Sequence, residues 1–426
     1  MKIAAHTLGC KLNFAETSYL LHRFASEGHE IVDFGEIADL YFINTCTVTA
    51  IAERKCRGAI RQAIRLNNQA IVAVIGCFAQ NESQQIATIP GVTIVLGNDE
   101  KHRLPEIVAN LKNDRGTMIS DNSPNRPTKF FGAYSTGDRT RSFLKIQDGC
   151  DYFCTYCAIP LARGRSRSAT IKEVLEMAHQ IAATGTKEIV LTGVNTGTFG
   201  YENGESLINL LRQLDNVDDI ERYRISSIEP NLLTDEIIEF TAKSRAFLPH
   251  FHIPLQSGSN RVLQMMHRRY TRELFGEKVM LIKQLMPDAC IAADIIAGFN
   301  GESNDDFEDS LSFLSTTQIS YLHVFTYSER PNTAALRITP KTTVEERRKR
   351  SQVLHSLSDK KLHQFHETQI GKRRLVLWES THHMGYMHGL TDNYIRLTHP
   401  YDINLVNNIS LETITSNNIV SSAPSD

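Results

Sequence analysis

The feature that most constrains the fold is a regular alternation of short apolar strands and helical stretches between residues 141 and 330. Six strands are predicted there: Phe143–Gln147, Glu188–Leu191, Tyr223–Ser227, Phe251–Leu255, Ile291–Ile296 and Tyr321–Thr326. Strands separated by helices pair in parallel, with crossovers of one hand. Six such units predict a partial form of the eight-stranded TIM barrel, with its functional edge at the carboxyl ends of the strands.

Residues 1–112 show a second alternation of the same kind. Four apolar strands and two helices are predicted: strands Ile3–Leu8, Leu40–Asn44, Ile71–Ile75 and Val92–Leu96, and helices Phe14–Glu27 and Val48–Leu66. This pattern predicts an open parallel α/β sheet. Residues 113–140 carry Pro, Asn, Ser and Gly with little periodicity, which indicates a linker.

A third pattern begins with a charged helix over residues 343–366. Short alternating strands follow it, at Arg374–Trp378, Asn393–Leu397 and Ser410–Ile414. A run of about 55 residues of this kind is typical of a small β-barrel, and the end, SNNIVSSAPSD, reads as disordered. We therefore expect an α/β protein with a sheet domain at 1–112, a linker at 113–140, a six-unit barrel at 141–366 and a β-barrel at 367–426.

Three cysteines follow the first barrel strand in one short loop. Cys150, Cys154 and Cys157, here called the loop cysteines, come after Gly149, which eases the turn. Three thiolates in one loop can hold three corners of a cubane iron–sulfur cluster and leave the fourth iron open to a ligand. The alternative is a zinc site completed by a distant fourth ligand.

Three further cysteines lie just past the ends of three strands of the N-terminal sheet. Cys10, Cys46 and Cys77, here called the edge cysteines, are far apart in the sequence. Because the carboxyl ends of parallel strands share one edge, where ligands bind, we expect these thiols to converge and hold a second cluster. The alternative is three unrelated buried cysteines.

The other two cysteines are expected to be structural. Cys56 falls on the apolar stripe of a predicted helix, and Cys290 begins a barrel strand, at the end away from the chemistry. No signal peptide or membrane span is recognised, so we expect a cytoplasmic protein without a disulfide framework. The net charge of −2 gives no overall electrostatic case for nucleic acid binding.

The segments around these cysteines resemble a known family. GCKLN at Cys10, INTCTVT at Cys46, IGC at Cys77 and GCDYFCTYCAIPLARGRSRS at residues 149–168 resemble the radical-SAM methylthiotransferases. Members of that family join a cluster domain, a radical-SAM domain and a C-terminal RNA-binding β-barrel of the TRAM type. The three regions above follow the same order, so the resemblance covers essentially the whole chain.

The resemblance implies two [4Fe-4S] clusters and S-adenosylmethionine as cofactors. The loop cysteines would hold the cluster that cleaves S-adenosylmethionine to a 5′-deoxyadenosyl radical, and the edge cysteines would hold the cluster that carries the sulfur. A reducing donor such as flavodoxin or ferredoxin would supply the electron to a monomeric enzyme. The resemblance also suggests cofactor contacts, whose alternatives are helix capping or, for the tyrosine, core packing: Tyr156, Gly193, Asn195, Ser227, Glu229, Gln256, Gly298 and Gly301.

The same segments point to a substrate. Family members modify a tRNA adenosine beside the anticodon, at position 37, or an aspartate of a ribosomal protein. GCKLN, with Lys11 after the first cysteine, and RGRSRS resemble the members that act on N6-threonylcarbamoyladenosine. The alternatives are isopentenyladenosine tRNA, a ribosomal-protein aspartate and, from another class, a non-catalytic RNA-binding iron–sulfur carrier or redox sensor.

Basic residues near the functional edge are candidates for phosphate contacts. They form three groups: Arg163, Arg165 and Arg167; Arg268 and Arg269; and Lys372, Arg373 and Arg374. The C-terminal module itself carries four basic against six acidic residues from His366 onward, which opposes a simple phosphate-binding role. The run Arg347–Arg350 is expected to be a solvated helix face.

Overall fold

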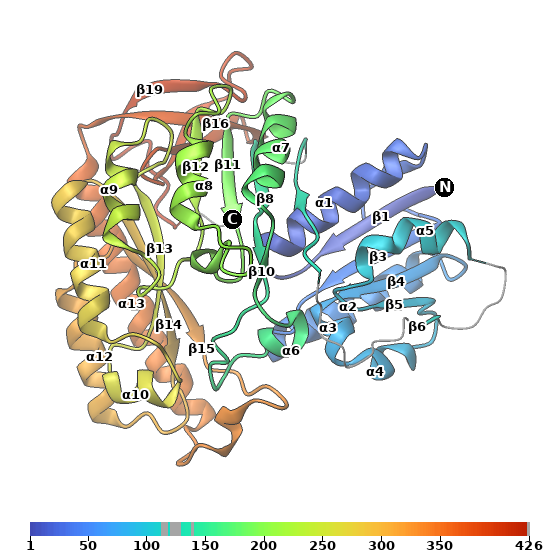
Figure 1. Ribbon diagram of the computed structural model, residues 1–426, viewed down its shortest axis with the longest axis horizontal. Helices are drawn as coiled ribbons and strands as arrows, with labels where there is room; N and C mark the ends of the chain where they lie inside the picture. Colours follow the sequence, from blue (N-terminus) through green and yellow to red (C-terminus); the bar gives the residue numbers. More distant parts are fainter. Residues whose placement is uncertain (112–117, 120–128, 138–139, 424–426) are drawn as a thin grey trace.

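The computed structural model describes residues 1–111, 118–119, 129–137 and 140–423. Figure 1 shows three parts: an N-terminal sheet domain in blue and cyan, a central barrel in green to orange, and C-terminal strands in red at one end of the barrel. The α/β class and the three-part order predicted from the sequence are confirmed.

The N-terminal part is a parallel sheet with helices on both faces. Its strand order is β2-β1-β3-β4-β5-β6. The strands are β1 (Lys2–Thr7), β2 (Glu30–Val32), β3 (Leu40–Thr45), β4 (Ile71–Gly76), β5 (Ile94–Leu96) and β6 (Met118–Ile119). The helices are α1 (Lys11–Ser26), α2 (Ala50–Leu66), α3 (Cys77–Asn81), α4 (Ser83–Ala87) and α5 (Leu104–Ala109). Strand β3, LYFINT, is buried along its whole length, as expected of a central parallel strand.

Two strands of this sheet were not predicted. The short β2 is partly exposed at one edge of the sheet, and β6 pairs with β5 at the other edge. Because β6 lies at residues 118–119, the sheet domain extends into the segment predicted as a linker. Much of the rest of that segment lies outside the described residues.

The central part is a partial barrel of six parallel strands, all of them predicted. They are β8 (Arg141–Lys145), β11 (Glu188–Thr192), β12 (Arg222–Ile225), β13 (His250–Gln256), β14 (Cys290–Ala297) and β15 (Tyr321–Thr326). A bridge between Tyr223 and Phe247 links the two halves of the sheet. A short strand, β7 (Ala133–Tyr134), pairs antiparallel with β8, so the predicted linker also contributes to the barrel.

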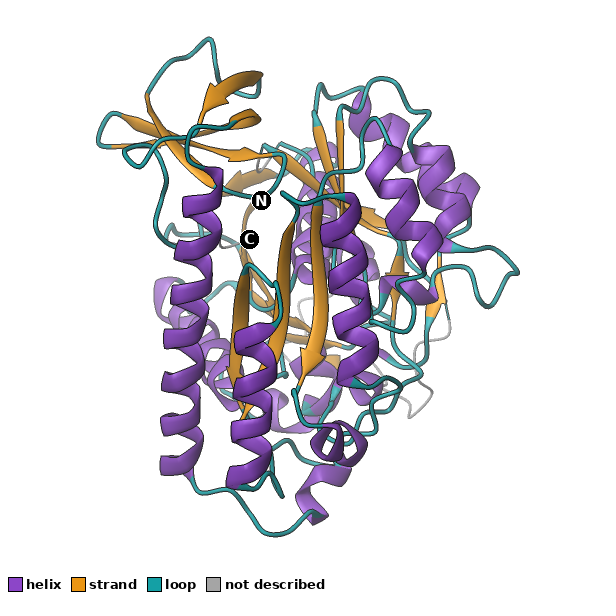
Figure 2. Ribbon diagram, turned by 90° about the vertical axis from the view of Figure 1, so that its left-hand side faces the viewer, coloured by secondary structure: helices purple, strands orange, loops and turns teal. Residues whose placement is uncertain are grey.

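Helices cover the outer face of the barrel, as Figure 2 shows. They are α7 (Ile171–Ala182), α8 (Leu207–Leu214), α9 (Asp235–Lys243), α10 (Asn260–Met265), α11 (Arg272–Leu285), α12 (Asn304–Thr316) and α13 (Val344–Gln369). Each begins after a Ser or Thr whose side chain accepts a hydrogen bond from a backbone N–H of the first turn. That N–H has no carbonyl acceptor within the helix itself. Their apolar faces and the outward-facing strand residues form one large core.

The run Arg347–Arg350 on α13 is only partly the solvated face that we expected, because Arg348 and Lys349 are exposed but Arg347 and Arg350 are not. Arg347 packs against Gly298 and pairs with Glu329, and Arg350 pairs with Glu302 at 2.6 Å. Both guanidinium side chains are buried. Sequence charge alone misled here because long basic side chains can be buried when a carboxylate is in reach.

A buried ion network joins the N-terminal domain to the barrel. Glu16 on α1 lies 2.5 Å from Lys101, 2.7 Å from Lys145 of β8 and 3.2 Å from Arg163. Asp148 accepts from the same Lys145 and Arg163, at 2.7 and 2.9 Å, and completes the network with Arg167 at 3.1 Å. All these side chains are buried. Two carboxylates therefore hold four cations across the domain boundary.

The C-terminal module is a curled half-barrel, a four-stranded antiparallel sheet of order β18-β17-β16-β19. Its strands are β16 (Arg373–His383), β17 (Tyr386–Thr391), β18 (Arg396–Pro400) and β19 (Ile409–Thr413). Strand β17 was not predicted. The tail is ordered further than expected, because Ile419 bridges to Leu397 and Val420 donates its N–H to Arg396.

A turn of this module closes the amino-terminal end of the barrel. Arg222 donates to the carbonyl of Leu390 at 3.0 Å, and Arg224 donates to the carbonyls of Thr391 and Asp392 at 2.8 and 3.0 Å. The Tyr394 ring stacks on His250 with a centroid distance of 4.0 Å. We call this contact the barrel floor. It leaves the carboxyl ends of the strands as the open end.

Candidate functional site

The loop cysteines lie at the carboxyl end of β8, as predicted. A short strand, β9 (Gln147–Asp148), leads into the loop, and Gly149 adopts a φ of +69°. A Cβ at this position would lie 2.0 Å from the carbonyl oxygen of Arg165, so only glycine fits. Two backbone hydrogen bonds of Thr155 hold the loop to the barrel. Its N–H donates to the Met266 carbonyl, and its carbonyl accepts from the Ala335 N–H.

The loop thiols lie where burial opposes their ionisation. Burial and the neighbouring thiols raise the pKa of Cys157 to about 12, and burial raises the pKa of Cys150 to about 11. Burial also raises the pKa of Cys154. A bound metal centre would stabilise thiolates in such a place, because its ligands must be deprotonated. The residues therefore fit a metal cluster.

The spacing of the thiols favours a cluster over a single zinc ion. A zinc ion holds its sulfurs at about 2.3 Å, which brings them within about 4 Å of one another. In the described part of the chain, one group of three possible metal ligands has its ligand atoms within 4.8 Å of one another. That group is His252, Asp294 and His323, and it contains no cysteine. The wider spacing of both cysteine sets suits a cubane, which places its thiolates on different irons.

The edge cysteines converge as expected from the sheet. Cys10 precedes α1, Cys46 follows β3, and Cys77 begins α3 directly after β4. Burial and the nearby thiol of Cys77 raise the pKa of Cys46 to about 12, with Cys10 contributing in the same direction. Gly9 lets the chains approach, because a Cβ there would lie 2.8 Å from the Cβ of Cys46.

Cys56 and Cys290 are buried, as predicted, but Cys56 lies against the backbone of Cys46, one of the edge cysteines. Cys56 has a local role, because the backbone N–H of Cys46 lies 3.5 Å from its sulfur, in the geometry of an N–H···S hydrogen bond. Cys290 begins β14 and packs in the core that joins the barrel to the C-terminal module. It therefore lies at the end of the barrel away from the loop cysteines.

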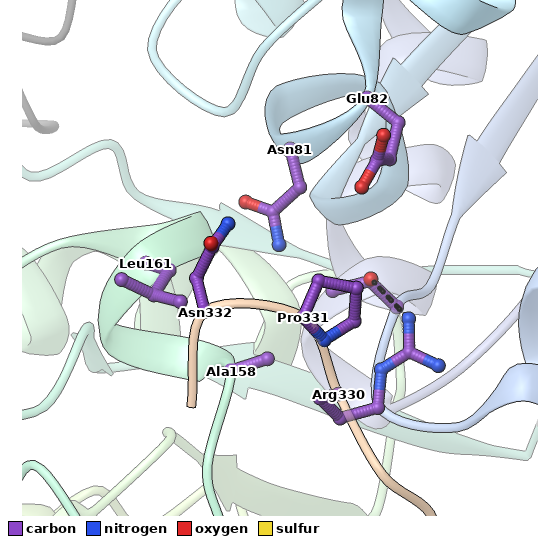
Figure 3. Close-up of a pocket in the computed structure, with 8 residues that line it drawn as sticks. Asn81, Glu82, Ala158, Leu161, Arg330, Pro331 and Asn332 are labelled. Atoms are coloured by element: carbon purple, nitrogen blue, oxygen red, sulfur yellow. Dashed lines mark hydrogen bonds between the residues drawn. The ribbon is translucent and has the colours of Figure 1, made fainter. Parts of the chain in front are cut away.

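A pocket opens between the segments that carry the two cysteine sets (Figure 3). Thr47 follows Cys46, Asn81 and Glu82 end the helix that Cys77 begins, and Ala158 follows Cys157. Helix α3 contacts α6 (Ile159–Arg163) across this boundary. Asn98 spans it, with its amide 3.7 Å from the sulfur of Cys77 and 2.8 Å from the carbonyl of Ala162.

The third wall of the pocket is the segment Arg330–Asn332 after β15. Arg330 is buried, pairs with Glu53 of α2 and donates to the Thr47 hydroxyl, a contact drawn in Figure 3. Its Nε has no hydrogen-bond partner in the described structure. Leaving a buried donor unpaired costs about 1–3 kcal/mol, so this Nε is available to a polar ligand or a water molecule in the pocket.

Three predicted cofactor-contacting residues lie at strand ends that face the loop cysteines. Asn195 follows β11 and is buried, yet neither its amide nitrogen nor its oxygen has a hydrogen-bond partner among the described residues. Gly193 stands beside it, where a Cβ would lie 2.9 Å from Gln147. Gln256 ends β13 with a φ of +69°, a strained conformation for a residue with a side chain. Unpaired and strained groups of this kind fit a bound polar ligand.

Glu229 and Tyr156 meet around a residue that the sequence analysis considered only for RNA. Arg268 pairs with Glu229, donates to the sulfur of Cys154 at 3.1 Å and to the Tyr156 hydroxyl at 3.4 Å. Burial raises the pKa of Glu229, against the opposing effect of Arg268. The structure thus places a buried cation directly against a loop cysteine, where it offsets the negative charge of a thiolate.

The remaining predicted contacts have local explanations that the sequence did not reveal. The Ser227 carbonyl accepts from Thr196 at 2.8 Å. Gly298 adopts a φ of +74° and would collide with Arg347 if it carried a Cβ, and Gly301 would collide with Ile338. Packing against the chain itself accounts for both glycines, so their contact with adenine stays a prediction.

Most of the basic residues proposed for RNA are used inside the protein. Arg163 and Arg167 belong to the buried network, and the side chain of Arg268 is only 3% exposed. For these three residues the prediction is wrong, because a sequence does not show which cations meet a carboxylate. Lys372 and Arg374 pair with Asp288 at 2.5 Å, but the Lys372 side chain keeps 41% exposure, so contact of this pair with phosphate stays a prediction. The exposed members of the three groups are Arg165, Arg269 and Arg373.

Comparison with known proteins agrees with this architecture. The model of "Uncharacterized protein family UPF0004" matches residues 2–97, and that of the "Radical SAM superfamily" matches residues 144–314. The fold is similar to that of the radical S-adenosylmethionine methyltransferase TsrM from Kitasatospora setae, with a TM-score of 0.56, 15% identity, and coverage of 78% of this chain and 76% of that one. No helix among the described residues is long and apolar enough to cross a membrane.

Curated relatives align over nearly the whole chain. The threonylcarbamoyladenosine tRNA methylthiotransferase MtaB of Aquifex aeolicus is 38% identical over 399 residues, which is 93% of this chain and 96% of that protein. MtaB of Bacillus subtilis is also 38% identical and covers 93% and 89%. The tRNA-2-methylthio-N(6)-dimethylallyladenosine synthase of Fusobacterium nucleatum is 32% identical and covers 88% and 87%. With these similarities, the chain belongs to the radical-SAM methylthiotransferase family.

Proposed function

We propose that this enzyme installs a 2-methylthio group on N6-threonylcarbamoyladenosine of tRNA, at position 37 beside the anticodon. The observation that carries the proposal is that residues next to Cys46 and Cys157, together with the end of the helix that Cys77 begins, line one pocket. Relatives with 35–38% identity are named for this activity. A non-catalytic carrier has no use for a barrel whose open end faces both sets.

Membership of the radical-SAM superfamily implies S-adenosylmethionine and one [4Fe-4S] cluster. We assign that cluster to the loop cysteines, which leave one iron open, and a second [4Fe-4S] cluster to the edge cysteines. When bound, these groups supply the one-electron cleavage that removes a hydrogen atom from the substrate carbon, and the sulfur that replaces it.

The chain's own residues bind, orient and shield these groups. Asn195 and Gln256, with Gly193 beside them, are proposed to hydrogen-bond the polar parts of S-adenosylmethionine. Arg268 screens the charge of Cys154 and fixes Glu229. The pocket residues come from three separate segments, and they are proposed to limit the access of water to the reacting carbon. Ser227, Tyr156, Gly298 and Gly301 remain proposed cofactor contacts.

RNA binding is proposed to use the cations that the ion networks leave exposed. Arg165 lies 72% exposed beside the loop cysteines, and Arg269 is exposed near the same loop. A splayed anticodon-loop base is the form of RNA that an enzyme pocket can reach. A reduced flavodoxin or ferredoxin is the proposed electron donor, and a monomer the proposed active state.

The test is nucleoside mass spectrometry of tRNA from a bacterial host that makes threonylcarbamoyladenosine without the methylthio group. Expression of the chain is expected to produce 2-methylthio-threonylcarbamoyladenosine, and the same host without the chain is expected to lack it. The tRNA digest also reports the isopentenyladenosine product in the same run.

Two outcomes would contradict the proposal. A methylthio group on isopentenyladenosine alone would move the substrate to that of the Fusobacterium relative. No product on tRNA, with full iron content and a methylthiolated ribosomal protein in the same cells, would move it to the protein substrate.

A further inference from the structure

Three polar side chains gather inside the barrel, away from both cysteine sets. His252 of β13, Asp294 of β14 and His323 of β15 place their ligand atoms within 4.8 Å of one another. Asp294 and His323 are directly paired across adjacent strands, and Nε2 of His252 lies 2.6 Å from the Asp294 carboxylate. We call this set the lumen triad.

The lumen triad faces the interior of the barrel rather than its helices. Ile291, Ala293 and Ile295 of β14 pack in the core under the helices, so the alternate residue Asp294 points the other way. On β15, Tyr321 and His323 share a face, with ring centroids 5.1 Å apart. The side chains of His252 and Asp294 keep 20% and 15% exposure, which shows that the barrel interior is open to a ligand there.

The triad lies within electrostatic reach of the loop cysteines. Asp294 has a pKa that burial would raise but that His252, His323 and Arg268 hold below its ordinary value. Glu229 is the other charged group on this side, and the negative charge of Asp294 contributes to raising the pKa of Glu229. Because Arg268 also contacts Cys154, the triad stands close to the place where S-adenosylmethionine is proposed to react.

Phe325 extends the same row toward the open end of the barrel. It lies two residues after His323, on the same face of β15, and its ring is 49% exposed. A large exposed ring at the mouth of a site that takes an unpaired base is suited to stack on that base. A base held there would direct its substituents toward the triad.

We propose that the lumen triad binds the threonylcarbamoyl group of the substrate adenosine. The imidazole of His323 donates to its carboxylate, and the carboxylate of Asp294 accepts from its hydroxyl or urea N–H. His252 donates through Nε2 to Asp294 and orients that carboxylate. This inference rests on the proposed function and names the groups that select its substrate. Carbon 2 and carbon 6 of adenine flank the same ring nitrogen, so a group on N6 lies near the carbon that reacts.

The same triad disfavours the isopentenyl substrate. An apolar substituent would exclude water from the triad without offering it a hydrogen bond. Taking a polar group out of water without a compensating hydrogen bond costs about 1–3 kcal/mol. Sites built to hydrogen-bond a substrate group reject analogues that lack it by large factors, up to about 10⁴–10⁵. The triad therefore selects for the polar substituent.

The test compares His323→Phe and His323→Gln with the unchanged enzyme on purified tRNA. The tRNA is used in two forms, one with threonylcarbamoyladenosine and one with unmodified adenosine at the same position. We expect His323→Phe to lower kcat/KM for the modified tRNA about 100-fold, mainly through KM. The ratio of kcat/KM for the modified tRNA to kcat/KM for the unmodified tRNA should fall toward one. His323→Gln keeps a hydrogen-bonding group and should recover part of that preference.

His363→Phe is the matched control, because His363 is 76% exposed on α13 and distant from the barrel interior. It should leave kcat/KM and the preference unchanged. Iron content and melting temperature confirm that each variant is folded. An unchanged preference in His323→Phe would overturn the inference while the tRNA product still upholds the proposed function. One equivalent of Co²⁺ bound by the unchanged enzyme, lost in His323→Phe and needed for activity, would replace it with a metal site.

Discussion

Replacing Cys154 with alanine is expected to abolish formation of 5′-deoxyadenosine from S-adenosylmethionine under reducing conditions, and with it all methylthiolation. Two thiolates cannot hold the cluster at three corners, so the site that cleaves the cofactor is lost. The iron content should fall from about eight to about four per chain, because the edge cysteines are untouched. Iron analysis and chromatography of the cofactor products measure both effects.

Cys290→Ala is the matched control for this experiment. It removes an equally buried thiol from the opposite end of the barrel, so iron content and cofactor cleavage should stay as in the unchanged enzyme. Cofactor cleavage that survives in Cys154→Ala would sink the assignment of the loop cysteines. A loss of all iron in that variant would show that the two clusters are not held independently.

Replacing Glu16 with glutamine is expected to cause the largest loss of stability. The change leaves Lys101, Lys145 and Arg163 buried with one carboxylate in place of two. Breaking a buried ion pair by removing one partner costs about 3–5 kcal/mol, because the remaining charge is uncompensated. Thermal unfolding should show a melting temperature lower by roughly 3–6 °C, at about 1 °C per kcal/mol for a chain of 426 residues.

Glu27→Gln gives the control just beyond the same helix. Glu27 pairs with Arg23 at the surface, and such i, i+4 pairs contribute about 0.3–0.5 kcal/mol. Equal melting temperatures for the two variants would contradict a stabilising role for the buried network. A further readout is acid unfolding of the unchanged protein. Burial by itself would raise the pKa of Glu16, but Arg163, Lys101 and Lys145 outweigh it and hold that pKa well below the usual range.

The sign of this pH effect follows from the lowered pKa. The unfolded chain binds the Glu16 proton more readily than the folded chain, so stability is full above the unfolded pKa and declines as pH falls through it. Asp148 has its pKa lowered by the same cations and acts in the same direction. Glu16→Gln should therefore be less sensitive to acid than the unchanged protein, relative to its own stability at neutral pH.

The elements that the sequence predicted well are those with strong periodic patterns. All six barrel strands and the placement of the six cysteines at strand ends follow from apolar runs and from the geometry of parallel sheets. Short edge strands such as β2 and β6 were missed, because three or two residues give no pattern to detect. Strand β17 was missed because its glycine, Gly389, interrupts the alternation.

The site residues that were missed are those whose role depends on a distant partner. Arg163 looked like a phosphate ligand beside the loop cysteines, but Glu16, far away in the sequence, takes its charge. Arg268 was considered for RNA and instead contacts Cys154. The lumen triad did carry a local signal, because His252, Asp294 and His323 are polar residues within otherwise apolar strands. Only the strand register shows that they meet.

The barrel floor decides which parts of this chain can be exchanged with relatives. A chimera that joined a foreign C-terminal module after α13 would remove the carbonyl acceptors of Arg222 and Arg224 and the ring that stacks on His250. Each buried donor left without an acceptor costs about 1–3 kcal/mol. A chimera will fold only if the foreign module has a turn that fits the barrel floor. The module and the barrel therefore have to be exchanged together, even though their secondary structures differ.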